Sequence, residues 1–389
     1  MRKKRITRVV SLVFAVFILL ILVSFLMWFF KSKNELNVFL LNKSVPTKER
    51  IEHKSFHWIL NQERYVKSNR ERYKLKTDYY GFFPVDPDKH QFDFRSIAVE
   101  EIGKISSETD IAYYADSYGV YYNDWYHNGQ LERDTEQKVY GGLNQNDYLL
   151  LKALMEKGKT VITEFVLLNQ TVSPRIREKT EDLLQLSWQG WIGRYFSSLN
   201  FRQNPEFPGW IVDLYENQNG TPWNFNDSGI VLIHRYGEII VLESSEHLTR
   251  DVPVIHTREK FAENYQLPLR LEYPYWFDVV KADNTDDVVA HFNLATNAVG
   301  DSLLAGYNLT ATFPAIIHPA TENYTLYYFA GDFCDNPIYT ATSYFSGIQL
   351  IDFLFYSKDD ADRKKFFWKY YIPLMQGILE DTQPKANSS

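Results

Sequence analysis

Residues 9–30 form an unbroken apolar run that contains no charged side chain. A helix that rises about 1.5 Å per residue extends about 33 Å over this run, enough to cross the hydrocarbon core of a membrane. Five basic residues stand among the first eight, whereas the far flank carries Lys31 and Lys33 with Glu35 close by. Because an excess of basic residues is retained on the cytoplasmic side, we expect the N-terminus there and the rest of the chain outside.

The end of this run decides between an anchor and a cleaved signal peptide. A signal peptide has an apolar core of about 7 to 15 residues and ends in small residues. Here the run is longer and ends in Met27, Trp28, Phe29 and Phe30 before Lys31. The sequence therefore predicts an uncleaved, single-pass signal anchor in the cell membrane.

The anchor divides the chain into four predicted parts. We expect a cytoplasmic tail at residues 1–8, the membrane helix at 9–30, a polar stalk at 31–35 and an extracytoplasmic domain at 36–389. About 355 residues exceed the usual size of one hydrophobic core, so we expect either one large domain with insertions or two lobes. No later segment is apolar over a membrane-spanning length.

Composition excludes several classes of function. The single cysteine, Cys334, rules out an intramolecular disulfide and a cysteine-rich zinc site. The formal net charge is -7, with acidic and basic residues interspersed. Such a chain lacks the basic stripe that neutralises nucleic-acid phosphates, so no nucleic-acid partner is expected. The sequence also lacks a glycine-rich phosphate-binding motif, and we predict neither a cofactor nor a metal.

Strand and helix signals alternate in the first half of the domain. Apolar runs rich in β-branched and aromatic residues predict buried strands, and the segments between them have helical spacing and caps. Asn146 is the expected cap of the second helix, and Gly158 follows its end. Strand, helix and strand in this order favour a parallel sheet with right-handed crossovers. The expected strands are residues 36–41, 110–116 and 160–165, and the expected helices are residues 49–61 and 148–156.

The second half contains a further helix, a hairpin and a C-terminal helix. Ser173 and Pro174 suit the start of a helix, and Gly237 suits the turn of a hairpin. Pro373 is expected to kink the C-terminal helix. The expected elements are a helix at residues 174–186, an aromatic segment at 188–196, hairpin strands at 230–233 and 238–242, and a helix at 359–379.

The order of elements resembles the flavodoxin-like fold of class I glutamine amidotransferases. It is similar also to their non-amidotransferase relatives, such as trehalose-utilisation-type proteins and the β-galactosidase trimerisation domain. Residues 110–116, 149–165 and 313–332 carry the resemblance. It implies an α/β domain with a flavodoxin-like, mostly parallel sheet, helices on both faces and inserted segments. In the amidotransferases a cysteine occupies the sharp turn at the position near Glu164, and no cysteine lies within reach here, so Cys-dependent glutaminase chemistry is not expected.

Polar residues that follow the apolar strands are candidate site residues, because ligands of open α/β sheets bind outside the carboxyl ends of the strands. Asp116, Glu164 and Asp332 are candidate catalytic residues. Two carboxyl groups about 5 to 10 Å apart can serve as general acid and base in glycoside cleavage. Lys43 follows the first strand and is a candidate ligand-binding residue. The alternative is that these side chains cap helices or bind loop amides.

Two further ligand-binding candidates lie in distinctive local sequences. Asp335 follows the Ala-Gly-Asp-Phe-Cys sequence, where Gly331 permits close approach of the backbone. The alternative is an Asx-rich turn before Pro337. Arg194 lies in a segment dense in aromatic residues and can bind a carboxylate with both arms of its guanidinium, or stack on the rings as a structural cation-π pair.

These features lead to two functional hypotheses. The first is a membrane-anchored protein of envelope or extracellular carbohydrate metabolism that binds or modifies a saccharide, with carboxylate acid/base chemistry of the hydrolase type if it is an enzyme. Aromatic residues make up 16% of the chain, and their flat faces suit stacking on sugars. The second is a non-catalytic interaction module that contacts other membrane or envelope proteins. Convergence of Asp116, Glu164, Arg194 and Asp332 on one pocket would favour the first.

Overall fold

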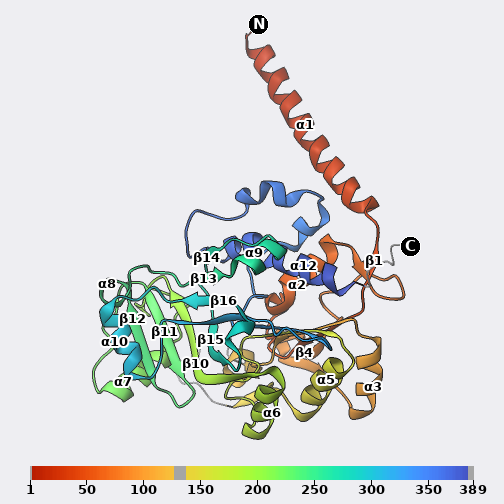
Figure 1. The fold of residues 1–389 in the computed structure, drawn as a ribbon. Coiled ribbons are helices and arrows are strands. Elements are labelled where there is room, and N and C mark those ends of the chain that lie inside the picture. Colours follow the sequence, from red (N-terminus) through yellow and green to blue (C-terminus); the bar gives the residue numbers. More distant parts are fainter. Residues whose placement is uncertain (1, 127–136, 384–389) are drawn as a thin grey trace.

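The computed structural model describes residues 2–126 and 137–383, and Figure 1 shows their arrangement. One long helix, α1 (Arg2–Phe30), projects from a domain built of a large sheet with helices on its faces. The α/β class expected from the sequence is confirmed. Among the described residues, Val10–Phe30 is the one helical segment long and apolar enough to span a membrane, a property that signal sequences share.

The main sheet has ten strands in the order β14-β13-β16-β17-β18-β9-β6-β2-β4-β5. Pairing is parallel from β18 to β4 and antiparallel toward both ends. The strands are β2 (Val38–Asn42), β4 (Tyr80–Asp86), β5 (Gln91–Arg95), β6 (Ile111–Asp116), β9 (Thr160–Glu164), β13 (Val254–Thr257), β14 (Arg270–Glu272), β16 (Val288–Asn293), β17 (Thr312–Ile317) and β18 (Thr325–Phe329).

The parallel strands give the sheet its topology. Numbered along the chain, β2, β4, β6, β9 and β18 are the first to the fifth, and they lie in the order 2-1-3-4-5. This is the strand order of flavodoxin-like sheets, in which the connections diverge between the first and third strands. The expected parallel sheet is thus present at the centre, and the antiparallel strands that extend it on both sides go beyond the expectation.

Helices cover both faces because the central strands are apolar on both sides. Every residue of β9 is buried, and in β6 only Asp116 is not, as expected for parallel strands between two helical layers. In Figure 1, α3, α5 and α6 lie on one face, and α2, α9 and α12 lie on the other. Their bounds are α2 (Ile51–Gln62), α3 (Val99–Glu108), α5 (Gln145–Glu156), α6 (Pro174–Leu184), α9 (Glu259–Tyr265) and α12 (Ile372–Thr382).

A second sheet, in the order β12-β11-β10-β15, has a hydrophobic cluster of its own. The hairpin between β11 and β12 turns at Gly237, whose φ of 88° is the positive value that a glycine allows, so the predicted hairpin is confirmed. Phe196 and Ile233 of this sheet pack with Ile211 of α7. The bounds are α7 (Gly209–Asn219), β10 (Leu186–Phe196), β11 (Gly229–His234), β12 (Ile239–Glu243) and β15 (Phe277–Ala282).

Short elements complete the described chain. They comprise two small sheets, β1 with β3 and β7 with β8, and several helices of one or two turns. Their bounds are β1 (Asn34–Glu35), β3 (Tyr65–Val66), β7 (Val120–Tyr121), β8 (Lys138–Tyr140), α4 (Tyr122–Tyr126), α8 (Ser244–His247), α10 (Ala298–Gly306), α11 (Arg363–Phe366), η1 (Pro87–Lys89), η2 (Thr285–Asp287), η3 (Thr340–Tyr344), η4 (Ile348–Leu354) and η5 (Phe367–Tyr371).

Two local predictions need correction. The cap of α5 is Asn144 and not Asn146, because the Asn144 side chain accepts hydrogen bonds from the backbone N–H groups of Asn146 and Asp147. The C-terminal helix begins at Arg363 and contains a π-helical turn, η5, just before Pro373. Proline has no N–H to donate, and a π-helical turn accommodates that loss without breaking the helix.

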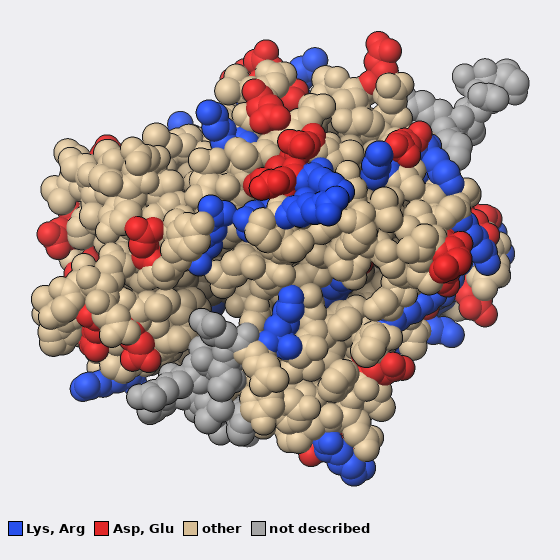
Figure 2. Space-filling view, turned by 90° about the horizontal axis from the view of Figure 1, so that it is seen from below, with Lys and Arg blue, Asp and Glu red and all other residues tan. Residues whose placement is uncertain are grey.

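The surface shows the expected mixture of charges. In Figure 2, which views the domain from below, acidic and basic side chains are interspersed, and no basic stripe crosses the part of this face that the structure describes. This distribution matches the interspersed acidic and basic residues of the sequence.

Candidate functional site

Asp116 ends β6 beside β2, at the point where the connections of the sheet diverge. Its Oδ1 accepts hydrogen bonds from Ser44 Oγ at 2.6 Å and from the backbone N–H of Tyr118 at 2.7 Å. Burial, together with the negative charge of Asp335, raises the pKa of Asp116 to about 7, although the two hydrogen bonds oppose the shift. Asp116 is therefore a carboxyl group that can exchange a proton near neutral pH.

Glu164 ends β9, next to the end of β18, since Glu164 and Phe329 are register partners in the parallel pair. It is 1% exposed and accepts hydrogen bonds from Tyr113 Oη and from the backbone N–H of Cys334, the latter at 3.3 Å. Burial and the nearby charge of Asp332 raise the pKa of Glu164 well above its ordinary range. Because β9 and β18 are parallel neighbours, Glu164 and the loop that carries Asp332 follow adjacent strand ends.

Asp332 and Asp335 lie in the loop that leaves β18. Arg363 Nη2 donates to Asp335 Oδ1 at 2.8 Å, and the guanidinium lies 3.2 Å from the centre of the Tyr275 ring. Burial and the charges of Asp335 and Asp116 raise the pKa of Asp332 well above its ordinary range, whereas Arg363 lowers it. This loop therefore brings two carboxyl groups and one guanidinium to the edge where Asp116 and Glu164 end their strands.

Glu52 joins the same group from the first turn of α2. Burial and the charges of Asp335, Asp116 and Asp332 raise the pKa of Glu52. Its Oε2 is buried and has no hydrogen-bond partner among the described residues. Sequence analysis missed Glu52 because an acidic residue in a first helical turn is ordinary; its one distinguishing signal is that α2 directly follows the first parallel strand.

Lys43 lies next to Asp116, but its side chain turns away from the carboxyl groups. The ammonium group is buried, pairs with Asp147 of α5 and donates to the backbone oxygen of Gly142 at 2.9 Å. A buried cation whose hydrogen bonds are made within the fold is a structural group. The structure therefore does not place Lys43 with the other candidates.

Arg194 of β10 lies at the aromatic side of this region. Its guanidinium is 4.9 Å from the ring centres of Phe196 and Tyr275, and it pairs with Glu206. Tyr275 is also the ring on which Arg363 stacks, so one tyrosine separates the two guanidinium groups. The structural stacking on aromatic rings is present, whereas Arg194 pairs with Glu206 through Nη2 alone and not with both arms of its guanidinium.

The sharp turn after β9 is at Val166, two residues beyond Glu164, where φ is 61°. A β-branched residue rarely adopts a positive φ, so the fold must hold it there. Asp278 of β15, which is 1% exposed, accepts the Val166 N–H at 3.0 Å and the Tyr328 hydroxyl at 2.8 Å. Sequence analysis missed Asp278. Valine has no nucleophilic atom, so this turn cannot supply a covalent catalyst.

Cys334 is fully buried beside Glu164 and Tyr371. Burial and the charge of Glu164 raise the pKa of the Cys334 thiol well above its ordinary value. The thiolate is the reactive form of cysteine, and both burial and a raised pKa suppress it. Cys334 is thus a small buried side chain.

We expect Cys334 in the folded protein to resist alkylation by iodoacetamide at pH 8, because the thiol neither ionises nor reaches solvent. Mass spectrometry of the treated protein measures the modified fraction. The same treatment in urea should modify Cys334 completely and serves as the control. Equal rates of modification with and without urea would contradict this assignment.

The histidines of α2 are engaged within the fold. His53 and His57 share a face of this helix and lie within hydrogen-bonding distance of the backbone oxygens of Leu75 and Tyr73. Among the described side chains, no three His, Cys, Asp or Glu residues are grouped in a way that can hold a metal ion.

Comparison with known proteins gives the fold neighbours. No protein-family model and no protein of curated function matches the chain. Among solved structures, it is similar to a ThuA-like protein from Parabacteroides merdae, with 12% identity, a TM-score of 0.36, and coverage of 76% of this chain and 79% of that one. It is similar to a ThuA-like protein from Bacteroides uniformis, with 10% identity, a TM-score of 0.34, and coverage of 80% and 89%.

A third similar structure is the β-galactosidase from Bacillus circulans sp. alkalophilus, with 11% identity and a TM-score of 0.34. The match covers 77% of this chain and 30% of the β-galactosidase. Likenesses with such low TM-scores do not establish a function, so the residues of this chain must indicate it.

Proposed function

We propose that this chain is a membrane-anchored protein whose extracytoplasmic domain binds a saccharide at the carboxyl edge of its parallel strands. The proposal rests on one observation. Carboxyl groups from separate segments of the chain lie together where the connections of the sheet diverge. The charge of each carboxyl group raises the pKa of another member of the group, or its own pKa is raised by the charge of another member, so the groups lie close together. The group consists of Glu52, Asp116, Glu164, Asp332 and Asp335.

The chemistry of this group suits a ligand rich in hydroxyl groups. Ionised carboxylates accept hydrogen bonds from sugar hydroxyls, and protonated carboxyl groups donate to sugar oxygens. Asp116, with a pKa of about 7, supplies both forms near neutral pH. Trp276, one of the three rings beside Arg194, is partly exposed and offers a flat face of the kind on which sugars stack. If the ligand is cleaved, Asp116 is the proposed general acid.

We also propose that the chain belongs to the non-amidotransferase branch of the glutamine amidotransferase-like superfamily. The strand order 2-1-3-4-5 supports this assignment, because it is the order of that fold. The sharp turn at Val166 supports the non-amidotransferase branch, since no cysteine stands there.

The contacts of α1 support an anchor that is retained in the mature protein. Trp28 is 1% exposed and donates from Nε1 to the backbone oxygen of Asn61 at 3.0 Å. Arg64 donates to the backbone oxygens of Trp28 and Phe29, which the end of a helix otherwise leaves without partners. Cleavage of α1 would remove all these contacts from the domain. The basic residues before α1 support an orientation with the domain outside the cytoplasm.

The alternative is a non-catalytic interaction module, and one observation favours it. Glu164 and Asp335 are buried, and their hydrogen bonds are made to Tyr113, Cys334, Tyr275 and Arg363 of the same chain. Glu52, Asp116 and Asp332 are the three members of the group that are partly exposed. Saccharide contact must therefore be made through the partly exposed members, and they are the residues to test.

The test is saccharide binding by the full chain in lipid nanodiscs, first on a glycan array and then by calorimetry with a glycan that binds. Asp116→Asn and Asp332→Asn should each weaken binding about tenfold, because an amide replaces a carboxyl group that accepts from or donates to the ligand, and each should change the melting temperature only slightly. Asp88→Asn, at an exposed position in η1, is the matched control and should bind as the unmodified protein does.

Two results would count against the proposal. Unchanged binding with a lowered melting temperature would assign the carboxyl groups to structure. Absence of binding to every glycan at millimolar concentration would favour the interaction module.

A further inference from the structure

Large apolar side chains are exposed on one loop of the domain, between Asp335 and α11. Leu350 is 84% exposed, Phe353 is 62% exposed and Leu354 is 66% exposed. The loop contains η3 and η4, and we call its exposed side chains the apolar patch. The patch consists of Tyr339, Tyr344, Leu350, Ile351, Phe353 and Leu354.

The polarity of η4 is the reverse of that of a helix on a water-exposed surface. Its acidic residue, Asp352, is buried and pairs with Lys369 at 2.7 Å, whereas four of its five apolar residues, all except Ile348, are exposed. In a soluble protein the carboxylate faces water and the apolar side chains face the core. A contiguous apolar surface of this kind marks a site of contact with an apolar partner.

The apolar patch lies beside the end of α1. Ser24 Oγ donates to the backbone oxygen of Ser346 at 2.7 Å, and the backbone N–H of Ser346 donates to the oxygen of Ser24 at 3.1 Å. The rings of Trp28 and Tyr344 meet edge to face with their centres 4.8 Å apart. Figure 1 shows the loop, in blue, on the face of the domain from which α1 projects.

This contact sets the depth of the loop in a membrane that α1 spans. Ser24 precedes Phe30, the end of the apolar segment, by six residues, or about 9 Å along the helix axis. Ser346 is hydrogen-bonded at the level of Ser24. For a helix near the membrane normal, the loop therefore lies about 9 Å inside the boundary that Phe30 marks. Interfacial helices bury their apolar faces by a similar amount, about 5 to 10 Å.

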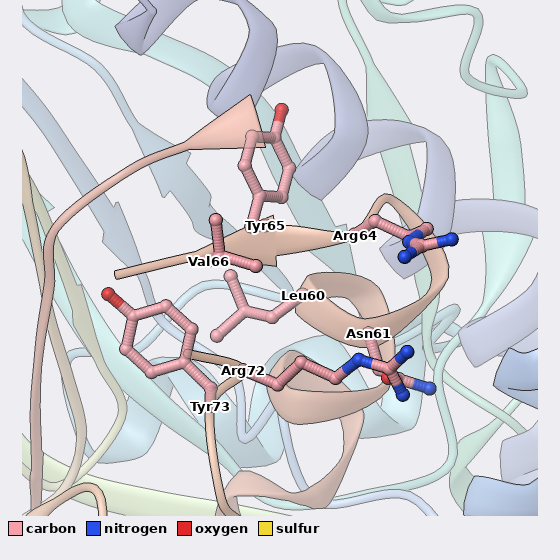
Figure 3. Close-up of a pocket in the computed structure, with 7 residues that line it drawn as sticks. All are labelled: Leu60, Asn61, Arg64, Tyr65, Val66, Arg72 and Tyr73. Atoms are coloured by element: carbon pink, nitrogen blue, oxygen red, sulfur yellow. The ribbon is translucent and has the colours of Figure 1, made fainter. Parts of the chain in front are cut away.

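The domain holds α1 and the loop in a fixed relation. Two guanidinium groups lie against the ring of Trp28, with Arg64 5.1 Å and Arg72 4.9 Å from its centre. Figure 3 shows these two arginines extending to the same side of a small hollow beside α2. On the other flank, Asn61 of α2 donates to Ser343 Oγ in η3 at 2.7 Å. α2 thus connects the helix end to the loop, and the loop cannot move away from α1 as a unit without loss of these bonds.

We infer that the apolar patch is inserted into the outer leaflet of the membrane beside α1. The domain then contacts the bilayer through both α1 and the apolar patch. This inference rests on the proposed membrane anchor. The patch contacts the lipid bilayer, because its loop is hydrogen-bonded through Ser346 to Ser24 of the membrane-spanning segment. The exposed side chains of the patch are apolar where lipid would surround them. Tyr339 and Tyr344 have the polar tips that suit the headgroup level.

The test uses the full chain in lipid vesicles, with an environment-sensitive dye on a single introduced cysteine. Phe353→Cys reports on the patch, Ile18→Cys reports on the middle of α1, and Glu178→Cys in α6 reports on the far side of the domain. Cys334 is buried, and dye uptake by the unmodified chain measures its background. Brominated lipids should quench the dyes at positions 353 and 18 but not at 178. Lipids brominated near the headgroup should quench the dye at position 353 more strongly than lipids brominated deep in the acyl chain. The dye at position 18 should show the reverse.

The outcomes separate the patch from the anchor. Quenching at position 18 with none at 353 would overturn the inserted patch while the anchor stands. The absence of quenching at both positions would overturn the anchor, and the patch inference with it. Disulfide-linked dimers of the Phe353→Cys protein, formed with no quenching by lipid, would assign the patch to a second copy of the chain.

Discussion

Replacement of Lys43 by methionine is expected to lower the free energy of unfolding by about 3 to 5 kcal/mol, the cost of breaking a buried ion pair from one side. The side chains of Lys43 and Asp147 are 3% and 1% exposed. Burial raises the pKa of Asp147, and Lys43 is the main group that opposes this shift. Without Lys43, Asp147 must be either an unpaired buried anion or a protonated acid, and both cost free energy. Urea titration of the detergent-solubilised protein, followed by tryptophan fluorescence, measures the change.

Two matched variants show whether the loss comes from the unpaired charge. Lys89 pairs with Asp86 on the surface, with 72% of its side chain exposed, so Lys89→Met should change stability by less than about 1 kcal/mol. The double variant Lys43→Met/Asp147→Leu removes both charges and should recover most of the loss. A residual loss of about 1 kcal/mol is expected because Asp147 also accepts the backbone N–H of Asn144 at 2.7 Å. Equal losses in the single and double variants would contradict the argument.

The central fold could be predicted because its signals are local. Residues 110–116 and 160–165 are apolar runs of strand length, and the structure has β6 and β9 there. The helix between them has helix-forming residues and a terminal glycine that are visible in the sequence, although its cap is Asn144 and not the expected Asn146. The antiparallel strands β13, β14 and β16 could not be assigned in the same way. Their partners lie tens of residues away, and a short apolar run does not specify its neighbour.

The candidate site was predictable in part for the same reason. Asp116, Glu164 and Asp332 follow strands, and a parallel sheet brings the ends of its strands to one edge. Glu52 and Arg363 come from helices, and neither has a local signal for its partners. Lys43 satisfies the strand-end rule, yet its side chain turns to Asp147, 104 residues away in sequence. The rule places the backbone, whereas long-range packing decides the direction of the side chain.

The ion pair of the site also closes the base of the loop that carries the apolar patch. Asp335 precedes the loop, Arg363 follows it, and their side chains meet at 2.8 Å. α2 runs from Glu52, at the site, to Gln62, just before the arginine that binds the end of α1. At about 1.5 Å per residue, the ten steps from Glu52 to Gln62 separate the two ends by about 15 Å.

The stabilisation that Asp278 contributes is expected to fall by about 2 to 3 kcal/mol as the pH rises from 5 to 8, and Asp278→Asn should remove this pH dependence. Burial raises the pKa of Asp278 to about 7, despite hydrogen bonds from Tyr328 and from the backbone of Val166. In the unfolded chain the pKa of an aspartate is about 3.9. Between these values the folded protein holds a proton that the unfolded chain has released, so the stabilisation is complete below about pH 4 and is lost as the pH passes 7. An aspartate that is ion-paired in the folded state would show the opposite slope.

The asparagine variant isolates this contribution because it keeps one oxygen for the Val166 N–H and cannot titrate. Urea titration at pH 5, 6, 7 and 8 measures the free energy of unfolding of both proteins. The value for the unmodified protein minus that for the variant should decrease by about 2 to 3 kcal/mol from pH 5 to pH 8. Asp116, whose pKa is also about 7, contributes a pH dependence of the same sign to the free energy of unfolding, and this contribution should remain in the Asp278→Asn variant. Asp88→Asn should retain the full slope, because Asp88 is exposed in η1. Parallel curves for the unmodified and Asp278→Asn proteins would show that Asp278 is already ionised at pH 5, and the raised pKa would then be wrong.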